Sequence, residues 1–357
     1  MKIGKSLVEL AREIERQKEA KVDFVANTKN IAMTADGNTL VAGHHQPVIG
    51  SIAHKQIAEH CGIPAKYYDR MKEQEPALLA ANVNKWLQRD PAPRMVRTLD
   101  GKARAFLSDK YRPLENSDLA EAVLPALIEA KVEVLSCEIT ESRFYIKAVD
   151  QRINHDVLPP GAKMGVGHVI FDTVCPAIVI SNSEVGMGAL NVQTSIFTKR
   201  CTNMAIFGER SIRKTHVGAR HEIADGLVHL LSDQTRRLTD AATWAQVRDV
   251  VTNAFNKDSF AEIVDRLSGA IDDKIEGDVV KVVELAAKKF GANDGERNSI
   301  LRHLIEGGDL SRYGLSAAIT RASADFPDYD RATEFERVGG QVIELPKSEW
   351  AELARAA

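Results

Sequence analysis

The chain has 357 residues, of which 44% are hydrophobic and 27% are charged, and its formal net charge is −3. This composition is typical of a globular protein with one large or two medium domains. Its apolar runs are too short to span a bilayer and its N-terminus has no apolar signal core, so we expect a cytoplasmic protein with no membrane partner.

Residues 1–90 are expected to form helices and one short hairpin. Apolar residues recur at helical spacing, and Asp36-Gly37 predicts a hairpin turn. Gly62 is expected to end one helix before the next begins. The expected elements are helices over 6–19, 51–61, 63–71 and 76–87, and a hairpin that joins 30–34 to 39–42.

From Met95 onward the pattern indicates strands. Asp100-Gly101 is a typical two-residue hairpin turn, and the glycines of SEVGMG (183–188) allow a second tight turn. A Pro- and Gly-rich loop covers 150–167. The expected elements are strands over 95–99, 103–107, 132–140, 142–149, 175–183 and 188–198, with a helix over 116–130.

After Gly208 the apolar spacing is helical almost to the end, and only Gly340–Leu345 is expected to form a late strand. We therefore predict an α+β fold, with an antiparallel β-sheet core and packed helices, followed by a mostly helical C-terminal region. Three regions are expected. They are 1–90, helical with a hairpin; 91–221, an α+β core with a basic face; and 222–357, an acidic helical region.

Positive charge is concentrated in two segments. Residues 199–221 hold six Lys/Arg and one acid, and residues 89–112 hold seven Lys/Arg and three acids. Such separation is expected of a protein that meets a polyanion on one face, although two ordinary solvated faces give the same pattern. The candidate nucleic-acid-binding residues are Lys199, Arg200, Arg210, Arg213, Lys214, Arg220, Arg97, Lys102, Arg104, Lys110, Arg112 and Tyr111.

Aromatic residues accompany both basic segments. Phe106 and Tyr111 lie in the first, and Phe197 and Phe207 flank the start of the second. Aromatic rings stack on the bases of single strands while cations hold the backbone. Core positions on alternating strands are the other interpretation of the three phenylalanines.

Two of the expected helices, 51–61 and 63–71, resemble a helix-turn-helix. Lys66, Asp69 and Arg70 would be the exposed polar residues of a DNA-reading helix. A helix pair that serves only packing has the same pattern, and the weak charge of the segment argues against a main contact surface.

No motif nominates a catalytic, metal or cofactor site. The four cysteines (Cys61, Cys137, Cys175 and Cys201) are scattered, so we interpret them as buried thiols in a reducing compartment. The histidines form no HxH or HExxH pattern, and neither a phosphate-binding glycine loop nor GxSxG occurs. We expect no cofactor, no metal and no enzymatic activity.

Four segments, taken in order, resemble the phage/plasmid-like protein family of unknown function. They are RAFLSDKYRPLENSDL (104–119), VISNSEVGMGAL (179–190), Cys201-Thr202-Asn203, and YGLSAAITRASADFPDYDRATEFERVGG (313–340). The resemblance extends over most of the chain, from about Ile52 to Leu345. It implies a protein of a phage or plasmid and supplies no catalytic residue.

The order of a hairpin, further strands and a basic strand-to-helix segment is similar to the core of phage single-strand annealing recombinases. That resemblance implies rings or filaments that hold single-stranded DNA along a basic groove. We therefore expect a homo-oligomer that binds and anneals single-stranded DNA in recombination or replication. A phage or host replication or recombination protein is the further partner considered.

Two alternatives stay open. The acidic region after Glu222 would suit a regulatory or protein-interaction factor of a mobile element, for example an antagonist of a host enzyme. A hydrolase that uses Asp or Glu with His155 or His168 is the other. A gel shift comparing single-stranded with double-stranded DNA, and a hydrolysis assay with metal, separate the three.

Overall fold

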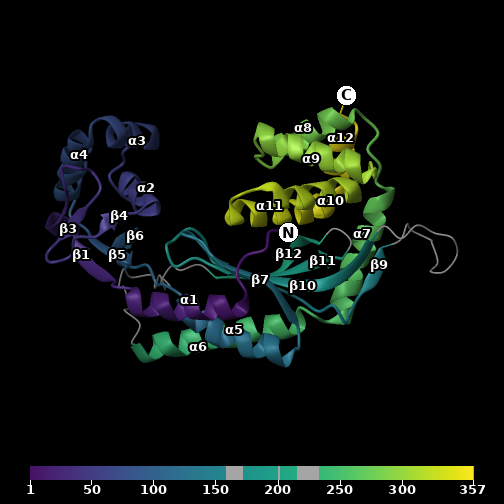
Figure 1. The fold of residues 1–357 in the computed structure, drawn as a ribbon, viewed down its shortest axis with the longest axis horizontal. Helices are drawn as coiled ribbons and strands as arrows, with labels where there is room; N and C mark the ends of the chain where they lie inside the picture. Colours follow the sequence, from purple (N-terminus) through teal and green to yellow (C-terminus); the bar gives the residue numbers. More distant parts are fainter. Residues whose placement is uncertain (158–171, 200–201, 215–232, 357) are drawn as a thin grey trace, which may run out of the picture.

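The computed structural model describes residues 1–157, 172–199, 202–214 and 233–356, and it has the expected α+β class (Figure 1). A small N-terminal unit lies to one side of a central antiparallel sheet. Helices cover the two faces of that sheet, and the C-terminal region is mostly helical as expected.

The N-terminal unit has two small sheets and three helices. Its elements are β1 (Phe24–Asn27), β2 (Ile31–Met33), β3 (Leu40–Ala42), β4 (Val48–Ile49), α2 (Ser51–His60), α3 (Ala65–Gln74), α4 (Pro76–Arg89), β5 (Pro93–Leu99) and β6 (Lys102–Ser108). The larger sheet has the order β1-β5-β6-β4, and β2 pairs with β3. Ile57, Leu79, Val83 and Val96 belong to its buried apolar core.

Both hairpins expected in this unit are confirmed. Asp100 and Gly101 have φ values of 52° and 74°, the left-handed conformation that a tight β5–β6 turn requires. The expected boundary at residue 90 falls between α4 and β5, inside this unit. The reason is that β5 and β6 pair with β1 and β4, so the two strands belong with the preceding residues.

The central sheet is wholly antiparallel in the part of the chain described. Its strands are β7 (Glu133–Ile139), β8 (Phe144–Val149), β9 (His155–Val157), β10 (Asp172–Asn182), β11 (Leu190–Thr198) and β12 (Asn203–Lys214). The order is β12-β11-β10-β8-β7, with β9 also pairing with β10. The expected strand pairs of this region are confirmed, with β12 as a further strand.

Helices cover both faces of the sheet. On one face lie α1 (Leu7–Ala20), α5 (Asn116–Glu129) and α6 (Asp233–Asn253), and Leu10, Val123 and Val247 pack there with Ile178 and Val192. On the other face lie α10 (Arg312–Ala322) and α11 (Tyr329–Glu344) (Figure 1). The N-terminal helix thus belongs to the central sheet and not to the N-terminal unit.

Three of the remaining helices form a layer above α10 and α11. They are α8 (Val279–Lys289), α9 (Asp294–Gly307) and α12 (Lys347–Ala354). The core of this layer includes Leu304, Leu315, Phe335 and Trp350. The layer is tied to the sheet through α10 and α11 rather than standing alone. The fourth helix, α7 (Lys257–Asp272), runs beside β9, where Phe260 and Val264 pack with Val157 and Val174.

Two expectations about this half are wrong. Residues after Gly208 continue β12 as far as Lys214, because their backbone pairs with β11. Gly340–Leu345 is not a strand, since α11 runs to Glu344. A Cβ on Gly340 would lie 2.0 Å from the carbonyl oxygen of Ile206, so this glycine permits the helix to lie directly on β12.

Candidate functional site

The second basic segment lies mainly on β12, the terminal strand of the sheet. Arg210, Arg213 and Lys214 are strand residues, not parts of a strand-to-helix link as expected. The register places Lys214 opposite Leu190 and Arg213 opposite Asn191. Lys199 follows β11, and its N–H donates to the carbonyl of Thr173 over 2.9 Å. Arg200 and Arg220 lie outside the described residues.

We call the side of β12 that faces away from β11 the β12 edge. Within the described ranges β12 pairs with β11 and with no further strand. The N–H of Gly208 donates to the carboxylate of Glu344, with 3.1 Å to Oε1. A carboxylate of the acidic half therefore already occupies one backbone donor of this strand.

Helices pack on both faces of the sheet to which β12 belongs. The α1, α5 and α6 layer covers one face, and α10 and α11 cover the other. Asn203 Nδ2 also donates to Thr320 Oγ1 over 2.6 Å, which joins the start of β12 to α10. The basic face expected from the sequence stays a prediction.

The first basic segment is divided between surface and interior. Lys102 and Lys110 are exposed, and Arg112 is half-buried. Arg97 is 1% exposed, and its cationic group is enclosed by protein. Tyr111 is half-buried, and its hydroxyl donates to the carbonyl of Ser183 over 3.0 Å. Arg97 and Tyr111 are thus committed to contacts inside the protein.

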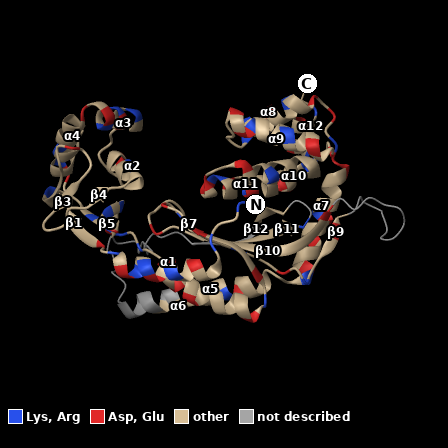
Figure 2. Ribbon diagram, in the orientation of Figure 1, with Lys and Arg blue, Asp and Glu red and all other residues tan. Residues whose placement is uncertain are grey.

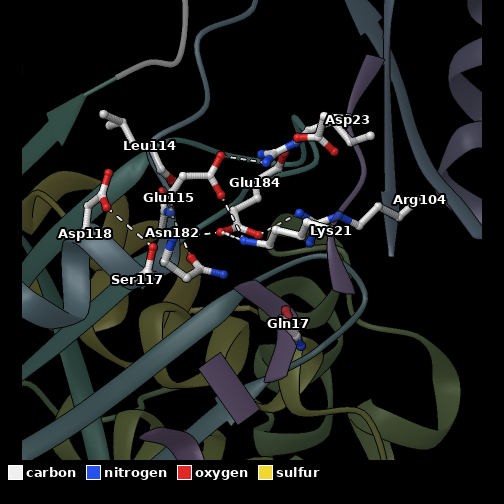
Figure 3. A network of polar contacts seen from close by, with 12 residues as sticks. Gln17, Lys21, Asp23, Arg104, Leu114, Glu115, Ser117, Asp118, Asn182 and Glu184 are labelled. Atoms are coloured by element: carbon white, nitrogen blue, oxygen red, sulfur yellow. Dashed lines mark hydrogen bonds and ion pairs between the residues drawn. The ribbon is translucent and has the colours of Figure 1, made fainter. Parts of the chain in front are cut away.

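Arg97 is the centre of a buried ionic network between the N-terminal unit and the central sheet. Figure 3 shows Lys21, Glu115 and Glu184 of this network. Its Nε donates to Asp23 Oδ2 over 2.8 Å, its Nη2 to Glu115 Oε1 over 2.6 Å, and its Nη1 to the carbonyl of Glu184 over 2.9 Å. Lys21 Nζ contacts both glutamates, at 2.9 Å to Glu115 and 2.7 Å to Glu184. We call Lys21, Asp23, Arg97, Arg104, Glu115 and Glu184 the joint network.

Arg104, another sequence candidate, completes this network. Its Nη2 lies 2.8 Å from Glu184 Oε2, and its side chain is 15% exposed. The network holds three cations and three acids, so it has no surplus positive charge to attract phosphate. Arg97 and Arg104 are therefore placed in a structural joint and not on a phosphate-binding surface.

The two glutamates of the joint network respond differently to their surroundings. Burial alone raises the pKa of Glu184, but Arg104, Lys21 and the N–H of Asn116 outweigh it and lower the pKa to about 2. Burial, and then the charge of Glu184, raise the pKa of Glu115. Glu184 is thus the permanent anion of the pair.

The segments that carry the family resemblance meet at such joints. Residues 104–119 and 179–190 supply Arg104, Glu115 and Glu184 to the joint network. Residues 313–340 reach β12 through Thr320 and Gly340. Neither Glu115 nor Glu184 could be recognised from the sequence, because isolated glutamates are usually solvent-exposed.

The helix pair α2–α3 packs as an ordinary unit around His54 and Tyr68. His54 Nδ1 and the Tyr68 hydroxyl are 2.8 Å apart, and burial lowers the pKa of His54 to about 4. Lys66, Asp69 and Arg70 are exposed, as a reading helix would need. One acid among two cations gives this face little attraction for phosphate.

Charge elsewhere is mixed. Figure 2 shows Lys and Arg interspersed with Asp and Glu on the helices of the C-terminal layer.

Among the residues described, no group of three or more His, Cys, Asp or Glu is arranged to hold a metal ion. No described helix is both long and apolar enough to cross a membrane. Cys61, Cys137 and Cys175 are free thiols, and Cys201 lies outside the described residues.

No family model, curated protein or solved structure matches the chain.

Proposed function

We propose that the protein binds single-stranded DNA along the β12 edge and promotes annealing, acting as a homo-oligomer in phage or plasmid recombination or replication. One observation carries this proposal. Three cations of the strongest basic segment, Arg210, Arg213 and Lys214, lie on the terminal strand of the central sheet. A terminal strand offers unpaired backbone donors close to these cations.

The length of β12 suits a polyanion. Its twelve residues extend over about 40 Å at the usual rise of about 3.3 Å per strand residue. That length spans several phosphates, and Lys199 lies beyond its first residue, near the β11–β12 turn. Binding would gain from release of counterions by each neutralised phosphate and would not depend on base sequence.

Binding of DNA along the edge of the sheet also suggests how annealing would proceed. A strand held by its phosphates along one edge keeps its bases free to pair with a second strand. Glu344, which accepts from Gly208 on β12, would compete with phosphate for this edge. We therefore expect DNA binding to displace that carboxylate contact.

The test is fluorescence anisotropy with labelled single-stranded and double-stranded DNA of equal length, from low to physiological salt. We expect tighter binding to the single strand. If about five phosphates are neutralised, log affinity should fall with log salt at a slope of about −3 to −4. Absence of binding at low salt, or a flat response to salt, would overturn the proposal.

A further inference from the structure

A pocket of about 730 Å³ lies between α11, the end of α8 and the start of β8. It is separate from the joint network, and its size is that of pockets that bind small organic ligands. Arg143, just before β8, and Arg337, on α11, both line it. Within the described residues neither guanidinium forms an ion pair with a carboxylate.

The two arginines are held by neutral groups only. Arg143 Nη2 donates to the carbonyl of Met187 over 2.6 Å, and Arg337 Nε donates to Gln193 Oε1 over 2.9 Å. Arg337 Nη2 is buried and has no hydrogen-bond acceptor in the described structure. Burial lowers the pKa of Arg337, and the positive charge of Arg143 lowers it further. An anion between these side chains would offset both the burial of the Arg337 charge and its repulsion by Arg143.

The acids that line the pocket have hydrogen-bonding partners other than Arg143 and Arg337. Asp330 accepts from the hydroxyls of Thr140 and Ser142. Glu334 pairs with Arg331 over 2.6 Å, and Asp328 accepts from the N–H of Arg331 at the start of α11.

The remaining pocket cation is also paired. Lys289 Nζ lies 2.7 Å from Glu349 Oε2. Among the described residues, Arg143 and Arg337 are therefore the pocket cations that have no carboxylate partner.

The arrangement selects a compact ligand with one anionic end. An extended polyanion crossing the pocket would meet the carboxylates of Asp328, Asp330 and Glu334, whereas a single phosphate between two guanidiniums would not. Phe290 and Val338 supply apolar wall for a ring. The carboxylates can accept hydrogen bonds from hydroxyl or amino groups of the same ligand.

We propose that this pocket binds a nucleoside monophosphate, with its phosphate on Arg143 and Arg337 and its nucleoside beside Phe290 and Val338. The ligand has two possible sources, a free nucleotide or the phosphorylated end of a nucleic-acid strand. The site is distinct from the β12 edge in its residues and in the charge that it takes, so it does not depend on DNA binding there.

The test is isothermal titration calorimetry of the full chain with the common nucleoside monophosphates, with adenosine and with inorganic phosphate. We expect at least one monophosphate to saturate one site per chain, and adenosine and phosphate to bind at least 10-fold more weakly. Failure of every monophosphate to saturate overturns the proposal. Equal affinity for inorganic phosphate would reduce the pocket to an anion site and overturn the nucleoside assignment.

The deciding variant is Arg143→Gln, because Arg337 also bonds to Gln193 and its loss would disturb packing. We expect R143Q to weaken nucleotide binding at least 10-fold with unchanged circular dichroism. The matched control is R302Q, since Arg302 is an exposed α9 arginine paired with Asp325 over 2.6 Å. Wild-type affinity in R143Q, or an equal loss in R302Q, would refute the placement of the phosphate.

Short oligonucleotides with a 5′-phosphate or a 5′-hydroxyl distinguish the two sources. Tighter binding of the phosphorylated oligonucleotide than of the free monophosphate assigns a strand end, and the reverse assigns the free nucleotide. Failure of DNA binding at the β12 edge would not affect the proposal for the pocket. Long single strands without a terminal phosphate probe the edge, and monophosphates probe the pocket.

Discussion

Lys147 Nζ donates a hydrogen bond to Glu336 Oε2 over 2.7 Å, and both side chains are completely buried. Lys147 lies on β8 and Glu336 on α11, so this ion pair joins the central sheet directly to α11. Lys147 Nζ also lies 4.6 Å from the centre of the Tyr329 ring. Burial lowers the pKa of Lys147, and Glu336 opposes that effect.

Removing one partner of this pair should be costly. Glu336→Gln leaves a buried ammonium without its counter-ion, so we expect the free energy of unfolding to fall by about 3–5 kcal/mol. The double variant K147M/E336L removes both charges and should recover most of that loss. Urea denaturation followed by circular dichroism measures both. A double variant less stable than E336Q would contradict this account.

Two helical glycines should respond in opposite directions to alanine. Gly340→Ala places a Cβ 2.0 Å from the Ile206 carbonyl oxygen, so α11 must move off β12, at a cost of about 1–3 kcal/mol or more. Gly269 in α7 has no atom within 4 Å of its added Cβ, and Gly269→Ala should stabilise by about 0.5–1 kcal/mol. We expect the urea midpoint of G340A to lie below that of the wild type and the midpoint of G269A to lie above it.

The sequence was informative where local chemistry decides the structure. The Asp100-Gly101 turn and the spacing of apolar residues on α1 and α5 predicted their elements, and the helical spacing of the second half predicted a mostly helical C-terminal region. It failed at Gly340–Leu345, where Val342 and Ile343 suit a strand or a buried helix face equally. It also failed at β12, since residues 208–214 (GERSIRK) have no alternating apolar pattern and their strand conformation is stabilised by backbone pairing with β11.

The candidate site was chosen from clustered charge. That clustering nominated Arg210, Arg213 and Lys214, which the structure places on one strand. Charge clustering could not tell these from Arg97 and Arg104, which are neutralised by Asp23, Glu115 and Glu184 from other segments. Only tertiary structure brings such partners together.

The joint network should make stability depend on acid pH. The pKa of Glu184 is about 2 in the folded protein and about 4.5 ordinarily. The contribution of ionised Glu184 to the free energy of unfolding is therefore complete above about pH 4.5 and is lost as pH falls toward 2. Glu184→Gln should lower the free energy of unfolding by about 3 kcal/mol at pH 7, and the difference from wild type should shrink below pH 4.5.

The neighbouring Glu115 acts in the opposite sense, because its pKa is raised in the folded protein. Its contribution is present at low pH and is lost as pH rises, so it offsets part of the Glu184 effect. Urea titrations at pH 7, 4 and 3 measure the balance. Glu276→Gln is the control, since its pair with Arg355 is exposed and should be worth less than about 1 kcal/mol. A difference between wild type and E184Q that is constant with pH would count against this assignment.

Self-association is expected through the β12 edge. A terminal strand presents backbone groups that a second copy can pair with, and the edge of one protomer is short for an annealing groove. Light scattering at micromolar concentration should give a mass well above the 39.2 kDa of one chain, with or without DNA. A monomeric mass under both conditions would exclude this arrangement.

The placement of DNA on β12 can be tested by removing its cations. The triple variant R210A/R213A/K214A should weaken single-stranded DNA binding at all sequences. Each neutralised phosphate contributes about 0.7 to the salt slope, so loss of three should make the slope shallower by about 2. Anisotropy titrations at four salt concentrations measure both affinity and slope.

The matched control removes three exposed lysines of the C-terminal layer. Lys281 and Lys288 on α8 and Lys347 on α12 are exposed and far from β12 in the chain. K281A/K288A/K347A has the same change in net charge, so a general effect of charge would appear equally in both variants. We expect the control to alter the salt slope by less than about 0.5, because salt screens the long-range attraction between these lysines and DNA. If it weakens binding as much as the β12 variant does, then DNA binding depends on net charge and not on the β12 edge.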